Sequence, residues 1–134
     1  KMSKSLDNHI ELAATAEETQ KRVMQMVTDP QRMRRTDPGR PEVCNVFSMH
    51  KVFSPAEEVA MIDTECRRAG IGCVDCKKRF AANLNAHLAP FRQRRTELAK
   101  DMDAVKAVLD DGAARAQKIA EQTMVEVRAA VGLP

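Results

Sequence analysis

Apolar residues recur at steps of three and four along most of the chain, which is the spacing of one face of an α-helix. Near the end of the chain, one such stripe contains Ala116, Ala120, Met124, Val127 and Val131. Glycine and proline fall between stretches of this kind, and we find no internal repeat. The pattern therefore indicates an all-α fold. The expected helices cover residues 16–27, 42–52, 55–69, 75–98, 101–110 and 113–130, after a short extended segment near 10–12.

Two of these helices have start signals in the sequence. Thr15 followed by Glu18 predicts a capping box, in which each side chain accepts a hydrogen bond from a free backbone N–H of the first turn. Ser54 and Pro55, followed by Glu57, predict a second start, with a cap, a proline at the first helical position and a returning carboxylate.

Prolines mark two other places in the pattern. Residues 28–41 hold three prolines, one glycine and four arginines, and a long loop of this kind in a compact domain is more often functional than idle. Pro90 lies inside the expected helix 75–98. Because proline lacks a backbone donor and collides with the preceding turn, we expect it to kink or divide that helix.

The composition is that of an ordinary folded protein. The 134 residues suggest one domain, and 43% hydrophobic with 31% charged residues excludes a disordered chain. No apolar run approaches the roughly 20 residues that span a bilayer, and no export signal is visible, so we expect no membrane partner and a cytoplasmic location.

The charge is informative only through its distribution. A net charge of +3 is too small to indicate nucleic-acid binding. However, basic residues form local clusters, which are typical of phosphate binding and also of solvated helix faces. The clusters are Arg32, Arg34, Arg35 and Arg40; Lys77, Lys78 and Arg79; and Arg92, Arg94 and Arg95.

Four cysteines, Cys44, Cys66, Cys73 and Cys76, follow the pattern C-x21-C-x6-C-x2-C. Four thiolates around one centre suit either Zn²⁺ or a [4Fe-4S] cluster. Zinc sites more often use two close pairs, and only one close pair exists here, so the spacing favours the cluster. Two alternatives remain: Cys66 could be a buried free thiol on an apolar helix face, and a disulfide is disfavoured without an export signal.

The chain opens with Lys1-Met2-Ser3-Lys4-Ser5. Two ammonium groups and two hydroxyls on a short loop suit a polyphosphate, because a lysine can follow negative charge onto a leaving group. The alternative is a generic basic tail. Since the first residue is Lys and not Met, we expect the chain to be a fragment of a longer protein.

This pentapeptide matches the KMSKS signature of class I aminoacyl-tRNA synthetases at every position. Over essentially all 134 residues the chain resembles the C-terminal portion of bacterial tryptophanyl-tRNA synthetases. The matching segments are Thr28-Asp29-Pro30, Asp37-Pro38-Gly39-Arg40-Pro41-Glu42, Gly72-Cys73-Val74-Asp75-Cys76-Lys77-Lys78, Pro90-Phe91-Arg92-Gln93-Arg94-Arg95, Met124-Val125-Glu126-Val127-Arg128 and Gly132-Leu133.

The resemblance implies a role for the opening loop. In that family the loop closes over ATP, with Mg²⁺, and its lysines stabilise the pyrophosphate leaving group as tryptophanyl-adenylate forms. Lys4 matches the more important catalytic lysine and Lys1 the other, and Ser3 and Ser5 would support phosphate binding. Residues 1–14 would end the catalytic domain. No HIGH-type motif and no nucleotide-binding fold is present, so we expect this part alone to be inactive.

For residues 15–134 the resemblance implies a helical bundle that binds the anticodon of tRNA(Trp). One subgroup of the family carries these four cysteines as [4Fe-4S] ligands, with zinc the runner-up here. Tryptophan and ATP would be partners of the intact enzyme, as a homodimer. Two alternatives are a stand-alone tRNA-binding or regulatory module and an iron–sulfur electron carrier. The expected tRNA-binding residues are Lys77, Lys78, Arg79, Arg34 and Arg35.

Overall fold

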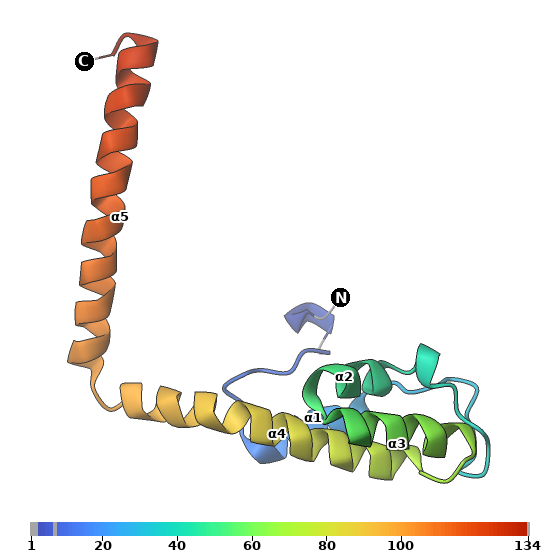
Figure 1. The fold of residues 1–134 in the computed structure, drawn as a ribbon. Helices are drawn as coiled ribbons and strands as arrows, with labels where there is room; N and C mark the ends of the chain where they lie inside the picture. The colour runs from blue at the N-terminus through green and yellow to red at the C-terminus, as the bar shows by residue number, and fades with distance from the viewer. Residues whose placement is uncertain (1–2, 7, 134) are drawn as a thin grey trace. The chain divides into compact units, whose positions relative to one another are not determined.

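The structure, a computed structural model, describes residues 3–6 and 8–133. Its elements are two short 3-10 helices and five α-helices, and no strand is found in the described part, which confirms the predicted all-α class (Figure 1). No described helix is both long and apolar enough to cross a membrane. The elements are η1 (Lys4–Leu6), α1 (Ala16–Gln25), η2 (Pro41–Val43), α2 (Asn45–Phe53), α3 (Ala56–Arg67), α4 (Cys73–Leu98) and α5 (Met102–Val131).

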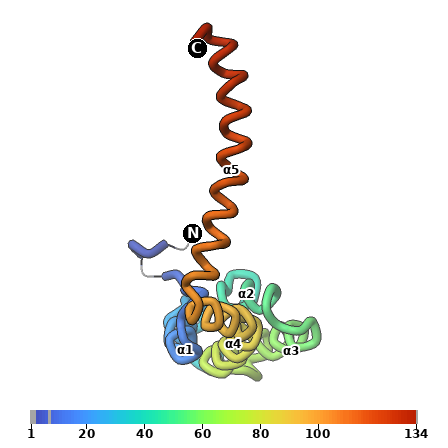
Figure 2. Tube along the Cα trace, turned by 90° about the vertical axis from the view of Figure 1, so that its left-hand side faces the viewer, coloured from blue at the N-terminus to red at the C-terminus, as the bar shows by residue number. Residues whose placement is uncertain are grey.

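The chain forms two compact units, Lys1–Arg92 and Gln93–Pro134. In the first unit, Figure 2 shows α1 and α3 on opposite sides of the first part of α4, with α2 above it. The core of this unit forms where the apolar faces of these helices meet, and fully burying one such side chain stabilises a fold by roughly 1.5–3 kcal/mol. The buried apolar residues are Val23, Cys44, Val46, Phe47, Ile62, Ile71, Phe80, Ala81, Leu84 and Leu88.

Helix α1 begins where the sequence predicts. Thr15 Oγ1 accepts from the backbone N–H of Glu18 at 3.1 Å, and the Glu18 carboxylate accepts from the backbone N–H of Thr15 at 2.7 Å, which confirms the capping box. The helix then runs antiparallel to α4. Lys77 donates to the Met24 carbonyl near one end of α1, and Asn85 donates to the Ala16 carbonyl at the other end.

The start of α3 differs from the expectation. The helix begins at Ala56, its cap residue is Pro55, and no side-chain cap hydrogen bond forms there. The Ser54 hydroxyl does not cap α3 because it contacts the His50 ring and the Asn83 amide. A tertiary polar contact has replaced the local one, and the sequence pattern alone could not show that choice.

Two expected helix breaks are absent. Helix α4 continues through Pro90 to Leu98, so Pro90 does not divide it, and the other expectation, a kink there, stays a prediction. The helices expected at 101–110 and 113–130 are one helix, α5, which continues through Gly112. A mid-helix glycine costs only about 1 kcal/mol relative to alanine and is not a stop by itself. Gly132, at φ 72°, ends α5 in the left-handed conformation that glycine adopts readily.

Candidate functional site

The four cysteines lie at three helix ends in the first unit. Cys44 directly precedes α2, Cys66 is in the last turn of α3, and Cys73 and Cys76 are in the first turn of α4. All four are free thiols, so the structure contains no disulfide among them. The other three each act electrostatically on Cys76, so the four cysteines lie in one region of the fold.

Burial controls the ionisation of two of these thiols. It raises the pKa of Cys76 to about 12, and the other three cysteines add to this rise while Arg32 opposes it. Burial also raises the pKa of Cys66, again with Arg32 acting in the opposite direction. Both thiols are therefore protonated at neutral pH, and a bound cation would have to displace their protons, which couples metal binding to proton release.

The arginine-rich loop 28–41 contacts the cysteine site through Arg32. One guanidinium nitrogen, Nη1, lies 3.7 Å from Cys66 Sγ, and the other, Nη2, donates to the carbonyls of Ile71 at 2.8 Å and Arg35 at 3.0 Å. A guanidinium in this place partly offsets negative charge on the sulfur. The loop and the cysteine site are therefore built as one unit.

Gly39 brings the same loop close to Cys66. Its backbone N–H donates to the Cys66 carbonyl at 2.9 Å. A Cβ atom added at position 39 would lie 2.4 Å from Cys66 Sγ, which is closer than real Cβ contacts. Only glycine at position 39 allows Cys66 Sγ to keep its present position.

Asp29 fixes the ends of the loop to each other. Its carboxylate accepts hydrogen bonds from the backbone N–H groups of Gln31 and Arg40 and from Nε and Nη2 of Arg40, the last at 2.7 Å. These hydrogen bonds, with the charge of Arg40, hold the pKa of Asp29 well below its usual range. Asp29 is almost fully buried. Sequence reasoning did not assign this pair, because 11 residues of irregular chain separate its members.

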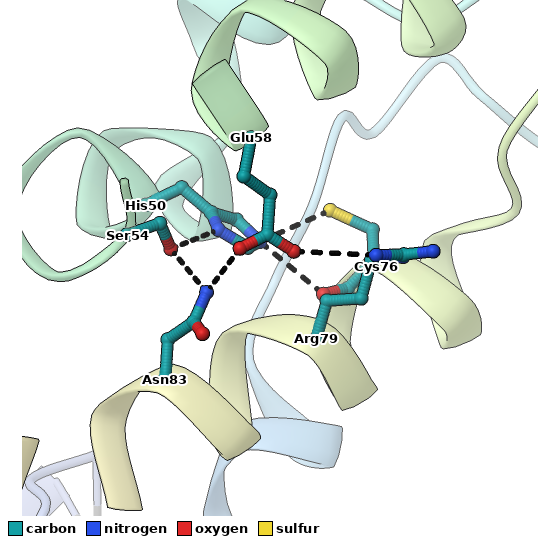
Figure 3. Close-up of polar contacts among 6 residues, drawn as sticks. All are labelled: His50, Ser54, Glu58, Cys76, Arg79 and Asn83. Carbon is teal, nitrogen blue, oxygen red and sulfur yellow. Dashed lines mark hydrogen bonds and ion pairs between the residues drawn. The ribbon is translucent and has the colours of Figure 1, made fainter. Parts of the chain in front are cut away.

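A polar network around His50, next to Cys76, was also not predicted from the sequence (Figure 3). His50, which is fully buried, has Nε2 3.2 Å from the Cys76 carbonyl oxygen and 3.5 Å from Cys76 Sγ. Burial lowers the pKa of His50, so the ring is neutral at pH 7. A histidine on α2 and a serine four residues later, at the C-cap of that helix, gave only a weak signal, since many helices carry such a pair.

The residues of the cysteine site fit a soft metal through their chemistry, because thiolates bind zinc and iron–sulfur clusters. Within residues 3–6 and 8–133, no group of three or more His, Cys, Asp or Glu side chains stands ready to hold a metal ion. The identity of any bound group therefore rests on the donor set.

The five expected tRNA-binding residues divide into two sets. Three of them already make contacts within the protein: Lys77 with the Met24 carbonyl, Arg79 with Glu58, and Arg35 with the carbonyls of Ala69 and Gly70. The other two, Arg34 and Lys78, have exposed side chains.

The arginine-rich loop and the start of α4 line a cavity of about 330 Å³. Its lining includes Arg34 and Arg35 from the loop and Cys73 from the first turn of α4. Lys77 and Lys78 follow one turn later on α4. The fold therefore places the arginine-rich loop beside the start of the helix that carries the basic Lys77–Arg79 segment.

The opening loop is described from Ser3 onward, so Lys1 and Met2 lie outside the described residues. Ser3 Oγ accepts from the backbone N–H of Leu6 at 3.3 Å and lies 3.1 Å from Ser5 Oγ. These contacts hold the short turn η1, on which Lys4 is exposed. The structure therefore places the exposed ammonium group of Lys4 on a compact turn.

Comparisons with known proteins show the family of the chain. The family model described as tRNA synthetases class I (W and Y) matches residues 1–89. The tryptophan–tRNA ligase of Aquifex aeolicus is 46% identical over 135 residues, which cover 100% of this chain and 34% of that protein. The tryptophan–tRNA ligase of Thermotoga maritima is 41% identical, over 99% of this chain and 41% of its own length.

A solved structure gives the same result. The tryptophanyl-tRNA synthetase of Campylobacter jejuni, in a crystal structure with ADP and tryptophan, superposes with a TM-score of 0.83 at 29% identity. The match covers 99% of this chain and 41% of that protein. The chain thus spans less than half the length of the relatives it matches.

Proposed function

Because the chain belongs to the class I tRNA synthetases of the tryptophan and tyrosine family, we propose that it is the C-terminal part of a tryptophan–tRNA ligase. The observation that carries this proposal is the 46% identity to a tryptophan–tRNA ligase along the whole chain. The enzyme activates tryptophan with ATP and transfers it to tRNA(Trp). The chain contributes the KMSKS loop and a helical tRNA-binding part, so residues 1–14 end the catalytic domain and residues 15–134 form the anticodon-binding domain.

In the first reaction, Lys4 and Lys1 stabilise the pyrophosphate leaving group, and Mg²⁺ accompanies the ATP. Exposed on η1, Lys4 can follow the charge that develops on the leaving oxygen. Ser3 and Ser5 contribute hydroxyl groups for the ATP phosphates. Their contacts in the structure also keep the turn compact, which limits the conformational freedom lost when ATP binds.

In the second reaction, the helical part binds the anticodon loop of tRNA(Trp). A single-stranded loop is bound through stacking and positive charge. The chain has no Trp or Tyr, so arginine planes take the stacking role. Arg34 and Lys78 are exposed and available to RNA, whereas Arg35, Lys77 and Arg79 would have to exchange or share their present contacts.

Cys44, Cys66, Cys73 and Cys76 are the proposed ligands of a [4Fe-4S] cluster, with zinc as the runner-up. When bound, such a cluster is redox-capable and ties together the helix ends that supply its ligands. Aminoacylation requires no electron transfer, so we assign it the structural role of holding α2, α3 and α4 beside the arginine-rich loop. The intact enzyme is proposed to be a cytoplasmic homodimer.

The test of the assignment is Lys4→Ala in the intact enzyme, measured by tryptophan-dependent exchange of pyrophosphate into ATP. Because the lost contact strengthens in the transition state, kcat should fall roughly 10²–10³-fold while the affinity for tryptophan changes little. Lys118→Ala, which removes an exposed lysine from α5, is the matched control and should behave as wild type. A Lys4→Ala enzyme with wild-type exchange would contradict the role of the loop.

A further inference from the structure

The structure contains a directed chain of hydrogen bonds that ends at Cys76, one of the four cysteines (Figure 3). Its start is Asn83 on α4, whose side-chain nitrogen donates to the Glu58 carboxylate at 2.5 Å and to Ser54 Oγ at 2.8 Å. A carboxylate can only accept, so the geometry fixes the orientation of the amide. The Ser54 oxygen is therefore an acceptor on the side that faces Asn83.

The next step is fixed by a carbonyl group, which can only accept a hydrogen bond. Ser54 Oγ lies 2.7 Å from His50 Nδ1. The Cys76 carbonyl oxygen, 3.2 Å from Nε2, can only accept, so Nε2 carries the ring proton of the neutral histidine and the Ser54 O–H donates to Nδ1. Nδ1 is then the acceptor nitrogen, and the ring proton is on Nε2. The surroundings thus determine the tautomer of a fully buried histidine.

The Nε2–H group of His50 is directed at Cys76. Nε2 lies 3.2 Å from the carbonyl oxygen and 3.5 Å from Sγ of this residue. The ring itself is held from the side by Phe80, edge to face at 5.3 Å between ring centres. The donor therefore has a fixed position as well as a fixed proton.

From this geometry we infer that His50 is a positioning residue for the cysteine site. Its ring is oriented by Ser54, Asn83 and Glu58. His50 directs its Nε2–H at Cys76 and stabilises the Cys76 sulfur as a metal-bound thiolate. The inference rests on the proposed iron–sulfur site. Partners that orient metal ligands typically contribute 10–100-fold in metal affinity. Arg32 is the corresponding donor to Cys66 on the other side of the site.

The network also reaches the proposed tRNA-binding surface. Glu58 Oε1 lies 3.4 Å from Nη1 of Arg79, while the other oxygen of the same carboxylate accepts from Asn83. Glu58 therefore acts on His50 through Asn83 and Ser54, and it also holds Arg79. One carboxylate connects the cysteine site to a basic residue of α4.

The test replaces His50 and measures the protein, reconstituted without oxygen, for iron and sulfide content and for the rate at which a chelator removes iron. His50→Leu keeps much of the volume but removes the donor, and it should release iron roughly 10–100-fold faster. His50→Gln places an amide N–H near Nε2 and should restore most of the retention. His87→Leu is the matched control, because His87 contacts Phe53 but no cysteine, and it should match wild type.

The outcomes separate this inference from the proposal it rests on. A wild-type protein that takes up no iron would overturn the cluster, and this inference with it. If wild type binds full iron and His50→Leu releases it at the wild-type rate, the inference alone is overturned. The same holds if His50→Gln releases iron as fast as His50→Leu.

If circular dichroism shows that His50→Leu does not fold, Ser54→Ala decides the question. This substitution leaves the ring in place but removes the hydrogen bond that holds Nδ1 and the orientation of the ring, so iron release should be several-fold faster than wild type. A wild-type release rate in Ser54→Ala would then overturn the inference.

Discussion

Asp29 shows how one buried carboxylate orders a loop of 14 residues. Four hydrogen bonds from Gln31 and Arg40 hold its pKa well below the usual range. A depressed carboxyl pKa contributes stability that is fully present above the unfolded value, near 4, and is lost as pH falls towards the folded value. The loop should therefore be most stable at neutral pH and less stable in acid.

We predict that Asp29→Asn lowers the Tm at pH 7, because the amide loses the charge-assisted bonds to Arg40. The variant should also lose part of the acid sensitivity of wild type below about pH 4. Thermal unfolding followed by circular dichroism at pH 7 and pH 3 measures both effects. Glu126→Gln, on an exposed position of α5, is the control. Equal Tm values for Asp29→Asn and wild type at pH 7 would refute the anchoring role.

Gly39 allows a second prediction at this scale. An alanine Cβ there would displace Cys66 Sγ, which can rotate away when no metal is bound but not when it is a ligand. Gly39→Ala should therefore fold without metal but bind substantially less iron on reconstitution. Gly112→Ala, where nothing lies within 4 Å of the added Cβ, should keep full iron content. Full iron content in Gly39→Ala would show that the close approach has no bearing on the site.

At the scale of the helix, Pro90 is the clearest departure from local preference. Helix α4 accommodates it, although its ring nitrogen cannot donate to the carbonyl of Ala86. Pro90→Ala would restore that hydrogen bond at an exposed position. The expected gain is about 1–3 kcal/mol in unfolding free energy, measured by urea denaturation. A destabilised Pro90→Ala protein would mean that the proline is required for a packing contact.

The helices also show what a sequence can predict. Thr15 and Glu18 predicted their own cap, because both partners lie within one turn. Ser54 did not cap α3, because its hydroxyl found partners 4 and 29 residues away.

The same division holds for the site. The spacing of the cysteines predicted a site that stays a prediction. His50 and Asp29 were missed because their partners are distant in sequence or lie along irregular chain. Local rules hold where the partners are local, and tertiary contacts override them elsewhere.

For the whole molecule, the cysteine site is where the fold and the proposed function meet. The four thiols lie at the ends of α2, α3 and α4, and Arg32 and Gly39 contact Cys66 from the arginine-rich loop. Metal binding at such a site contributes folding free energy. Loss of the site should therefore loosen the basic surface. Adenylate formation, which we propose to involve the opening loop, should change much less.

The central claim is that this helical part, organised by its cysteine site, binds the anticodon of tRNA(Trp). The most direct measurement is made on the intact enzyme, as wild type and as Cys76→Ser: the affinity for tRNA(Trp) and for the same tRNA with a changed anticodon, together with the rate of adenylate formation. Wild type should bind tRNA(Trp) at least tenfold more tightly than the anticodon variant, and Cys76→Ser should lose most of that difference while still forming adenylate. Equal affinity of wild type for the two tRNAs, or full discrimination by Cys76→Ser without a bound metal, would contradict the account.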